Sequence, residues 1–171
     1  MKKKSNTFKA AVLFNLKKPL KIIKINHPDK LKKGQIYIRL KSSSICGAQA
    51  NEINGIKGPD NYLPHMMGHE GYGEVINVGK NVKKVKKGDN VILHWRKGYG
   101  IEAEAGSYYS KKFGKINSGK VTTFSEYTIV SENRVTKIKI TNKLKKIAPC
   151  FGCSLSTSYG LVFREAKMKI N

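Results

Sequence analysis

The feature that most constrains the fold is a series of short apolar runs, each ended by glycine, proline or asparagine. Ile36-Tyr37-Ile38-Arg39-Leu40 is apolar apart from one charge, and Glu74-Val75-Ile76-Asn77-Val78 alternates imperfectly. Both runs are β-branched, which favours strands over helices. Such runs, separated by turn residues, predict a β-rich barrel or sandwich. The expected strands are Phe8–Phe14, Leu20–Ile25, Ile36–Ile45, Gly71–Val78, Asn90–His94, Phe124–Val130 and Arg134–Lys137.

Helix signals are weak until the end of the chain. Lys143–Ala148 predicts one short turn, and Ser156 or Thr157 is expected to cap a helix that runs into Phe163–Lys169. The segment from Lys97 to Gly119 is rich in Gly, Tyr, Ser and Lys and shows no clear period. We expect a long surface lobe there.

The net charge of +23 results from 34 basic and 11 acidic residues. Only Arg39, Arg96, Arg134 and Arg164 are arginines, although arginine is the residue that binds phosphates and bases in a bidentate manner. This excess of lysine indicates a drift in composition, and predicts only weak, nonspecific, salt-sensitive binding of nucleic acid. A non-catalytic basic β-barrel that binds nucleic acid or another polyanion is the alternative function.

The cysteines and the hydropathy bear on the cellular compartment. No run approaches the roughly 18 apolar residues of a membrane helix, so no membrane partner is expected. Cys46, Cys150 and Cys153 are an odd number of cysteines without an export signal. They predict reduced thiols and a cytoplasmic location.

The residues best suited to chemistry are Cys46, His69 and Cys153, with Glu70 beside the histidine. Two thiolates and one imidazole leave one tetrahedral position open, which is the form of a catalytic zinc site. Glu70 would orient a ligand or join the metal transiently. Taken alone, Cys46 is more consistent with a small buried apolar residue than with a metal ligand. Cys150 and Cys153 form a C-x-x-C pair, but no second pair and no βαβ pattern supports a zinc knuckle or redox couple.

These residues stand in motifs that resemble the catalytic domain of zinc-dependent medium-chain alcohol dehydrogenases. The resemblance runs from Lys9 to Gly160, and its motifs occur in family order. The matching segments are Ser44–Gly47, Pro64–Val75, Val78–Gly79, Lys87–Val91, Thr123–Tyr127 and Gly152–Thr157.

The resemblance implies a mainly β (α+β) fold, a GroES-like, partly open β-barrel with a few short helices and without the Rossmann domain. It implies that Cys46, His69 and Cys153 bind zinc, that Glu70 is catalytic, and that Thr157 lies near the nicotinamide of NAD or NADP. The implied reaction is hydride transfer between a zinc-held small alcohol or aldehyde and NAD(P).

The proton relay departs from the family pattern. Ala48 stands where family members often carry a hydroxyl that passes the alcohol proton, and Asn51 stands where some carry a histidine. Alanine cannot transfer a proton. Water, Gln49 or Asn51 would have to replace this relay.

The lobe also departs from the pattern. Many family members carry four cysteines there, which hold a structural zinc, whereas residues 97–119 contain none. One catalytic zinc and no structural zinc are therefore expected. If the lobe is not mobile, the side chains expected to hold it are Tyr99, Tyr108, Tyr109 and Phe113.

The third departure concerns the dinucleotide. The fingerprint G-x-G-x-x-G binds a pyrophosphate at a helix start, but no glycine follows Gly160. We expect residues 1–160 to form the zinc-binding domain and 161–171 to begin a connection to an absent dinucleotide-binding domain. The resemblance thus implies a truncated or split dehydrogenase that is inactive alone. A separate Rossmann-domain polypeptide or a homo-oligomer is the expected protein partner.

Overall fold

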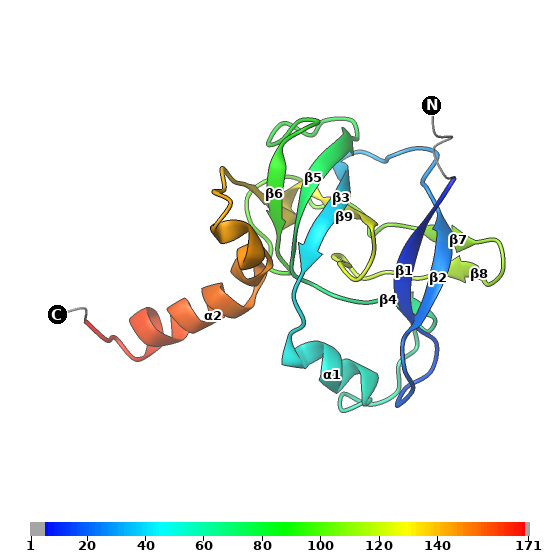
Figure 1. The fold of residues 1–171 in the computed structure, drawn as a ribbon, viewed down its shortest axis with the longest axis horizontal. Helices are drawn as coiled ribbons and strands as arrows, with labels where there is room; N and C mark the ends of the chain where they lie inside the picture. Colours follow the sequence, from blue (N-terminus) through cyan, green and yellow to red (C-terminus); the bar gives the residue numbers. More distant parts are fainter. Residues whose placement is uncertain (1–5, 170–171) are drawn as a thin grey trace.

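The computed structural model describes residues 6–169 and is mainly β (Figure 1). Residues 1–5 of the expected zinc-binding domain and residues 170–171 of the expected connection lie outside the described residues. The strands are β1 Thr7–Leu13, β2 Lys21–Asn26, β3 Gln35–Ser43, β4 His65–Met66, β5 Gly71–Val78, β6 Asn90–Leu93, β7 Tyr108–Ser110, β8 Gly114–Ile116, β9 Tyr127–Ser131 and β10 Val135–Lys137. The helices are α1 Gly47–Ile53 and α2 Ser154–Gly160, the 3₁₀ turns η1 Glu132–Arg134, η2 Leu144–Lys146 and η3 Ala148–Gly152, and the π-helical turn η4 Leu161–Glu165.

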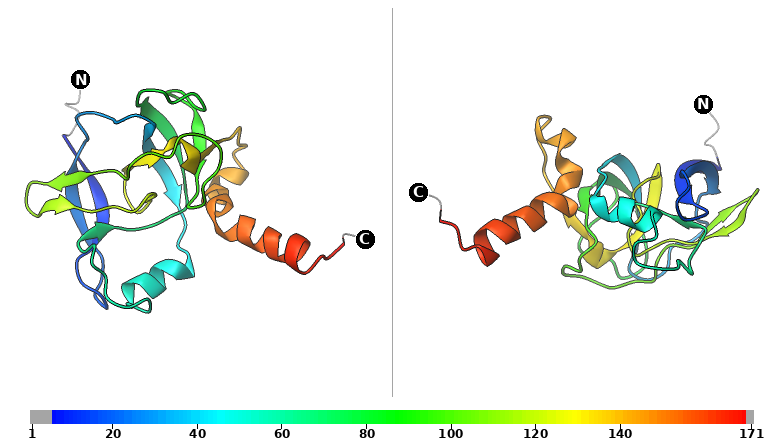
Figure 2. Two further views of the ribbon diagram at one scale, coloured as in Figure 1. Left: turned by 180° about the vertical axis from the view of Figure 1, so that it is seen from behind. Right: turned by 90° about the horizontal axis from the view of Figure 1, so that it is seen from below.

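The strands form a five-stranded sheet of order β10-β6-β5-β3-β9, a three-stranded sheet β2-β1-β4 and the pair β7-β8. Within residues 6–169 every pairing between these strands is antiparallel, so this part of the chain contains no parallel Rossmann-type sheet. The two larger sheets curl toward each other, while α1 lies below them and α2 projects away (Figures 1 and 2). The expected partly open β-barrel is confirmed. None of the helices in the described residues is long and apolar enough to cross a bilayer.

The position of β3 between two apolar clusters explains the continuous apolar run Ile36–Ile38 in its first half. Ile36 and Ile38 pack into a cluster with residues of β5 and β6, including Val75 and Leu93. Tyr37, on the opposite face, packs into a second cluster with residues of β1 and β2. Because successive side chains of a strand point to opposite faces, a strand covered on both faces needs apolar residues throughout.

The seven expected strands are present, with small shifts at their ends. Gly71–Val78 is reproduced as β5. The largest shift concerns β9, which begins at Tyr127 and not at Phe124. The backbone N–H groups of Thr123 and Phe124 both donate to the carbonyl of Met67. This segment therefore bonds to the loop before β5, and the pairing with β3 begins only at Tyr127.

The C-terminal helix differs from the expectation. Ser156 and Thr157 do not cap it, because α2 already begins at Ser154. The helical conformation ends at Glu165 in η4, so it does not reach Lys169. The short turn expected near Lys143–Ala148 is present as η2, followed at once by η3. The sequence signals missed α1, β4, β7 and β8.

The lobe, residues 97–119, is held mainly by polar contacts and one buried ring. Tyr108 is buried and its hydroxyl accepts the N–H of Ile129 at 2.7 Å, and Phe113 packs edge-on against Phe14. Tyr99 and Tyr109 are exposed. They do not hold the lobe as expected.

Glu102 connects this lobe to η1. Its carboxylate accepts hydrogen bonds from Asn133 Nδ2 at 2.8 Å and Arg134 at 3.3 Å, and lies 3.5 Å from the ammonium groups of Lys97 and Lys120. Asn133 first, then Arg134 and Lys97, lower the pKa of Glu102 from an ordinary 4.5 to about 2 against the opposing effect of burial. The carboxylate is thus stabilised by the folded state.

We expect this contact to make stability acid-sensitive. The unfolded chain has the ordinary pKa of 4.5 at Glu102, so the contribution to the free energy of unfolding is complete above pH 4.5 and is lost as pH falls to about 2. Glu102→Gln lacks it at every pH. Urea unfolding of both chains should show a stability difference that shrinks over this pH range. A difference that is constant with pH would contradict the assignment.

Candidate metal centre

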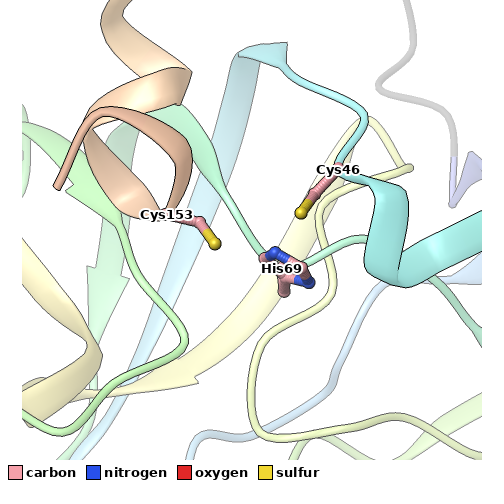
Figure 3. Close-up of side chains that lie close together, drawn as sticks. All are labelled: Cys46, His69 and Cys153. Atoms are coloured by element: carbon pink, nitrogen blue, oxygen red, sulfur yellow. The ribbon is translucent and has the colours of Figure 1, made fainter. Parts of the chain in front are cut away.

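Three segments far apart in sequence meet at one end of the barrel. Cys46 lies between β3 and α1, His69 between β4 and β5, and Cys153 immediately before α2. One ligand atom of each residue lies within 4.8 Å of the other two. The three side chains point toward one another (Figure 3). The structure therefore brings together the three residues that the sequence selected as metal ligands.

Close backbone approach places His69. The preceding Gly68 has a φ of +91°, and a Cβ at this position would lie 2.5 Å from Thr123 Oγ1. A side chain there would be strained by the backbone angle and would collide with the Thr123 segment. Gly68 therefore allows the chain to turn so that His69 faces the thiols.

Gly152 places Cys153 in the same manner. A Cβ on Gly152 would lie 2.2 Å from the carbonyl oxygen of Leu93 and 2.9 Å from Glu70 Cβ. The end of η3 is thus pressed directly against β6 and the start of β5. This contact sets the position from which the Cys153 side chain extends.

Glu70 is buried and contacts the segment of the third ligand. Its Oε2 accepts hydrogen bonds from the backbone N–H of Ser154 at 3.1 Å and from Ser154 Oγ at 3.3 Å, and its backbone carbonyl accepts one from Ser43. A carboxylate at the first N–H groups of a helix satisfies donors that have no partner within the helix. Glu70 therefore orients the start of α2, directly after Cys153.

The imidazole of His69 is held from one side. Its Nδ1 contacts the side-chain amide of Gln49, whereas its Nε2 is buried and has no hydrogen-bond partner among the described residues. Gln49 also accepts the backbone N–H of Cys46 at 3.1 Å. This role of Gln49 was not foreseen from the sequence, although the spacing Cys46-x-x-Gln49 is that of a helix capping box.

The protonation of the metal-free site follows from burial. Burial lowers the pKa of the His69 imidazole, and the carboxylates of Glu70 and Glu52 oppose this only in part. Burial likewise raises the pKa of the Cys153 thiol, and Cys46 and Glu70 raise it further. Both effects favour the neutral forms of these groups.

A cavity of about 860 Å³ opens onto the three residues. Thr157, one helical turn after Cys153, lies on its wall, as does Ala48. The cavity therefore has the size of a small-molecule site.

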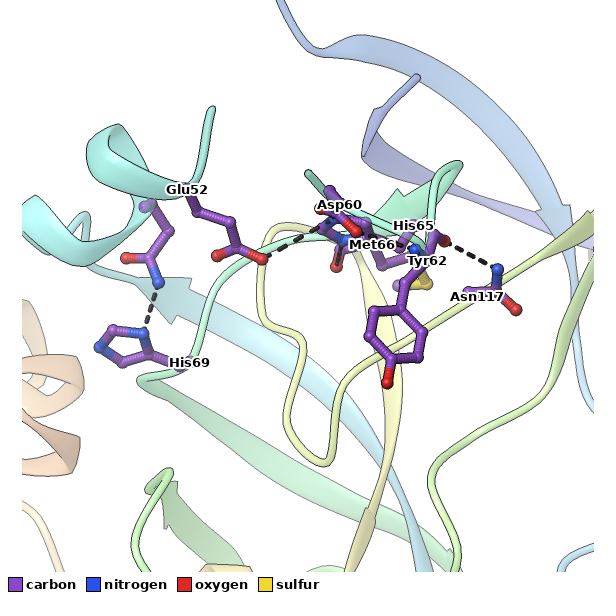
Figure 4. A network of polar contacts seen from close by, with 8 residues as sticks. Glu52, Asp60, Tyr62, His65, Met66, His69 and Asn117 are labelled. Carbon is purple, nitrogen blue, oxygen red and sulfur yellow. Dashed lines mark hydrogen bonds and ion pairs between the residues drawn. The ribbon is translucent and has the colours of Figure 1, made fainter. Parts of the chain in front are cut away.

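A second group on the cavity wall was not foreseen from the sequence. His65 Nε2 lies 2.8 Å from Asp60 Oδ2 and 3.8 Å from Glu52 Oε1, and its Nδ1 donates to the carbonyl of Met66 (Figure 4). Burial alone would raise the pKa of Asp60, but the N–H of Tyr62 and the His65 side chain lower it. Both ring nitrogens of His65 therefore have a partner among its neighbours.

Comparison with known proteins decides the family. Residues 32–140 match the family described as alcohol dehydrogenase GroES-like domain. The chain belongs to this family. The GroES-like fold expected from the motifs is thereby confirmed.

Curated relatives of this GroES-like domain are considerably longer than the chain. The chain is 31% identical to an alcohol dehydrogenase class-3 of Drosophila melanogaster over 95% of its length, and it covers 48% of that protein. It is 30% identical to an S-(hydroxymethyl)glutathione dehydrogenase of Escherichia coli, covering 94% of the chain and 49% of the relative. The chain thus spans about half the length of the curated relatives it matches.

Solved structures agree with the GroES-like fold. An alcohol dehydrogenase zinc-binding domain protein from Burkholderia ambifaria superposes with a TM-score of 0.82 at 19% identity, covering 96% of this chain and 50% of that one. The alcohol dehydrogenase of Aeropyrum pernix has a TM-score of 0.69 at 26% identity, covering 94% and 48%.

Proposed function

We propose that this GroES-like domain is the zinc-binding catalytic part of an alcohol dehydrogenase-like oxidoreductase. The proposed reaction is hydride transfer between a small alcohol or aldehyde and NAD(P). The family and the names of its relatives support the reaction class. The observation that carries the proposal is the convergence of Cys46, His69 and Cys153 on a cavity of about 860 Å³.

The donor set fits zinc. Two thiols and one imidazole match the preference of this ion for sulfur and nitrogen, and three protein ligands leave a fourth position for a substrate. The buried, unpartnered Nε2 of His69 is the kind of polar atom that is costly to bury without a partner. A bound zinc ion would be the partner of this nitrogen, and would act as a Lewis acid on the substrate oxygen.

In this proposal the surrounding residues position the reaction. Glu70 is a positioning residue, because it fixes the start of α2 and through it the Cys153 thiol. Thr157 lies on the cavity wall one turn later, where we assign it to the nicotinamide side of the dinucleotide. Ala48 offers no proton carrier beside Cys46, and Gln49 is engaged by His69 and the Cys46 backbone. Water in the cavity would then accept the alcohol proton.

We further propose one metal ion in this domain. Cys46 and Cys153 belong to the site described, and the remaining cysteine, Cys150, lies outside the group of three ligands. The lobe, residues 97–119, contains no cysteine. Its contacts through Glu102 and Tyr108 hold it to the barrel without such ligands.

The proposal is tested by the zinc content of the purified chain after dialysis. We expect about one zinc ion per chain. Cys153→Ser should lose this zinc or bind it much more weakly, since it removes one of three ligands. Cys150→Ser is the matched control, because Cys150 lies in η3, three residues before Cys153, but outside the ligand group. It should retain the metal.

Two results would contradict the proposal. One is a folded wild-type chain that binds no zinc in the presence of excess metal. The other is an equal loss of zinc in Cys153→Ser and Cys150→Ser, which would indicate a C-x-x-C site in place of the site with Cys46 and His69.

A further inference from the structure

The side chain of Gln49 lies between two groups that both donate hydrogen bonds when a metal is bound. Gln49 is 2% exposed, and its Oε1 accepts the backbone N–H of Cys46 at 3.1 Å. Its Nε2 faces Nδ1 of His69. The Gln49 amide therefore contacts two of the three proposed ligands, the backbone of Cys46 and the ring of His69.

The donors and acceptors of this contact determine the tautomer of His69. The Cys46 N–H needs an acceptor, which fixes Oε1 of Gln49 on that side and leaves the amide nitrogen toward His69. An amide nitrogen only donates, so His69 Nδ1 must accept. A neutral imidazole then carries its proton on Nε2, the buried atom that has no partner among residues 6–169.

Metal binding requires the opposite tautomer. A metal ion binds the lone pair of Nε2, so the proton has to move from Nε2 to Nδ1, where it needs an acceptor. In this position, the Gln49 amide can provide this acceptor only if its oxygen and its nitrogen exchange places. Its nitrogen would then face the N–H of Cys46, and two donors would oppose each other. A carboxylate could accept from both groups at once.

We propose that Gln49 is a positioning residue that holds His69 in the Nε2–H tautomer and thereby weakens zinc binding by this chain. This inference rests on the proposed zinc site. It adds that the affinity of the site is limited by the second contact of one ligand, not by the number or spacing of the ligands.

The direct test replaces Gln49 by glutamate. Gln49→Glu keeps an acceptor for the Cys46 N–H, as in a capping box, and adds an acceptor for Nδ1–H. Because outer contacts of ligating histidines change metal affinity by about tenfold or more, we expect Gln49→Glu to bind Zn²⁺ at least about tenfold more tightly in competition with a chromophoric chelator.

Asn51→Asp is the matched control for charge. It adds the same negative charge on the same helix, at an exposed side chain, without a contact to His69. We expect it to gain much less affinity than Gln49→Glu. An equal gain in the two variants would show that charge alone acts, and would overturn the role assigned to Gln49.

A second measurement needs no variant. The ¹⁵N chemical shifts of the His69 ring in the metal-free wild-type chain report which nitrogen carries the proton. We expect Nε2–H in the wild type and Nδ1–H in Gln49→Glu. An Nδ1–H tautomer in the metal-free wild type would overturn the inference.

The outcomes separate this inference from the proposed function. If the wild type and Gln49→Glu bind zinc with equal affinity, the role of Gln49 is overturned and the zinc site is unaffected. The absence of zinc from both chains overturns the zinc site itself, and the effect of Gln49 on its affinity falls with it.

Discussion

Gly152→Ala is expected to destabilise the fold by about 3 kcal/mol and to abolish tight zinc binding. The added Cβ would lie 2.2 Å from the Leu93 carbonyl oxygen and 2.9 Å from Glu70 Cβ. Neither neighbour is the far end of a flexible side chain, so the contact can be relieved only by moving η3 away from the sheet. Cys153 follows directly and would move away from His69.

Gly160→Ala is the control for the loss of a glycine in the same region. A Cβ at Gly160, in α2, has no neighbour within 4 Å, so this variant should be neutral or slightly stabilising through helix propensity. Urea unfolding and zinc competition on both variants check the prediction. A Gly152→Ala chain with the stability and zinc affinity of the wild type would contradict the close contact.

Glu132→Ala is expected to lower the free energy of unfolding by about 3 kcal/mol. The buried Glu132 carboxylate accepts three backbone N–H groups, from Lys83 at 2.6 Å, Lys84 at 2.7 Å and Ile101 at 2.9 Å. Alanine leaves these donors without an acceptor. The segment before β6 and the lobe, residues 97–119, lose their shared anchor.

The control for Glu132 is Glu104→Ala. Glu104 forms an ion pair with Lys32, but both side chains are largely exposed, and such pairs contribute little. We expect no measurable change in its urea midpoint. Hydrogen exchange adds a local check, since the amides of Lys83, Lys84 and Ile101 should lose protection in Glu132→Ala. Unchanged protection of these amides would contradict the assigned contacts.

The sheets could be predicted from sequence because their strands carry the signal themselves. Gly71–Val78 and the centre of β3 are apolar and β-branched, and the structure buries them. The short elements could not. Helix α1 has no apolar period and starts after a cysteine, and β7 and β8 have three residues each. They depend on contacts with distant segments, such as the bond from Ile129 to Tyr108.

The residues of the candidate site can likewise be separated into those that the sequence predicted and those that it did not. Cys46, His69 and Cys153 stand in motifs with flanking glycines, so the sequence singled them out and the structure brings them together. The sequence indicated Gln49 only as a possible proton carrier, because its contact with His69 requires α1, a helix that the sequence did not predict. His65 and Asp60 meet through a loop whose path no local signal specifies.

The position of Cys153 has a mechanical consequence. Cys46 and His69 belong to segments that return to the barrel on both sides, whereas Cys153 begins a helix that leaves it (Figures 1 and 2). Gly152 is in close contact with Leu93, and the helical segment that follows Cys153 extends to Glu165. Because Cys153 lies between this contact and the projecting helix, a tilt of α2 relative to the barrel would change the direction of the Cys153 thiol.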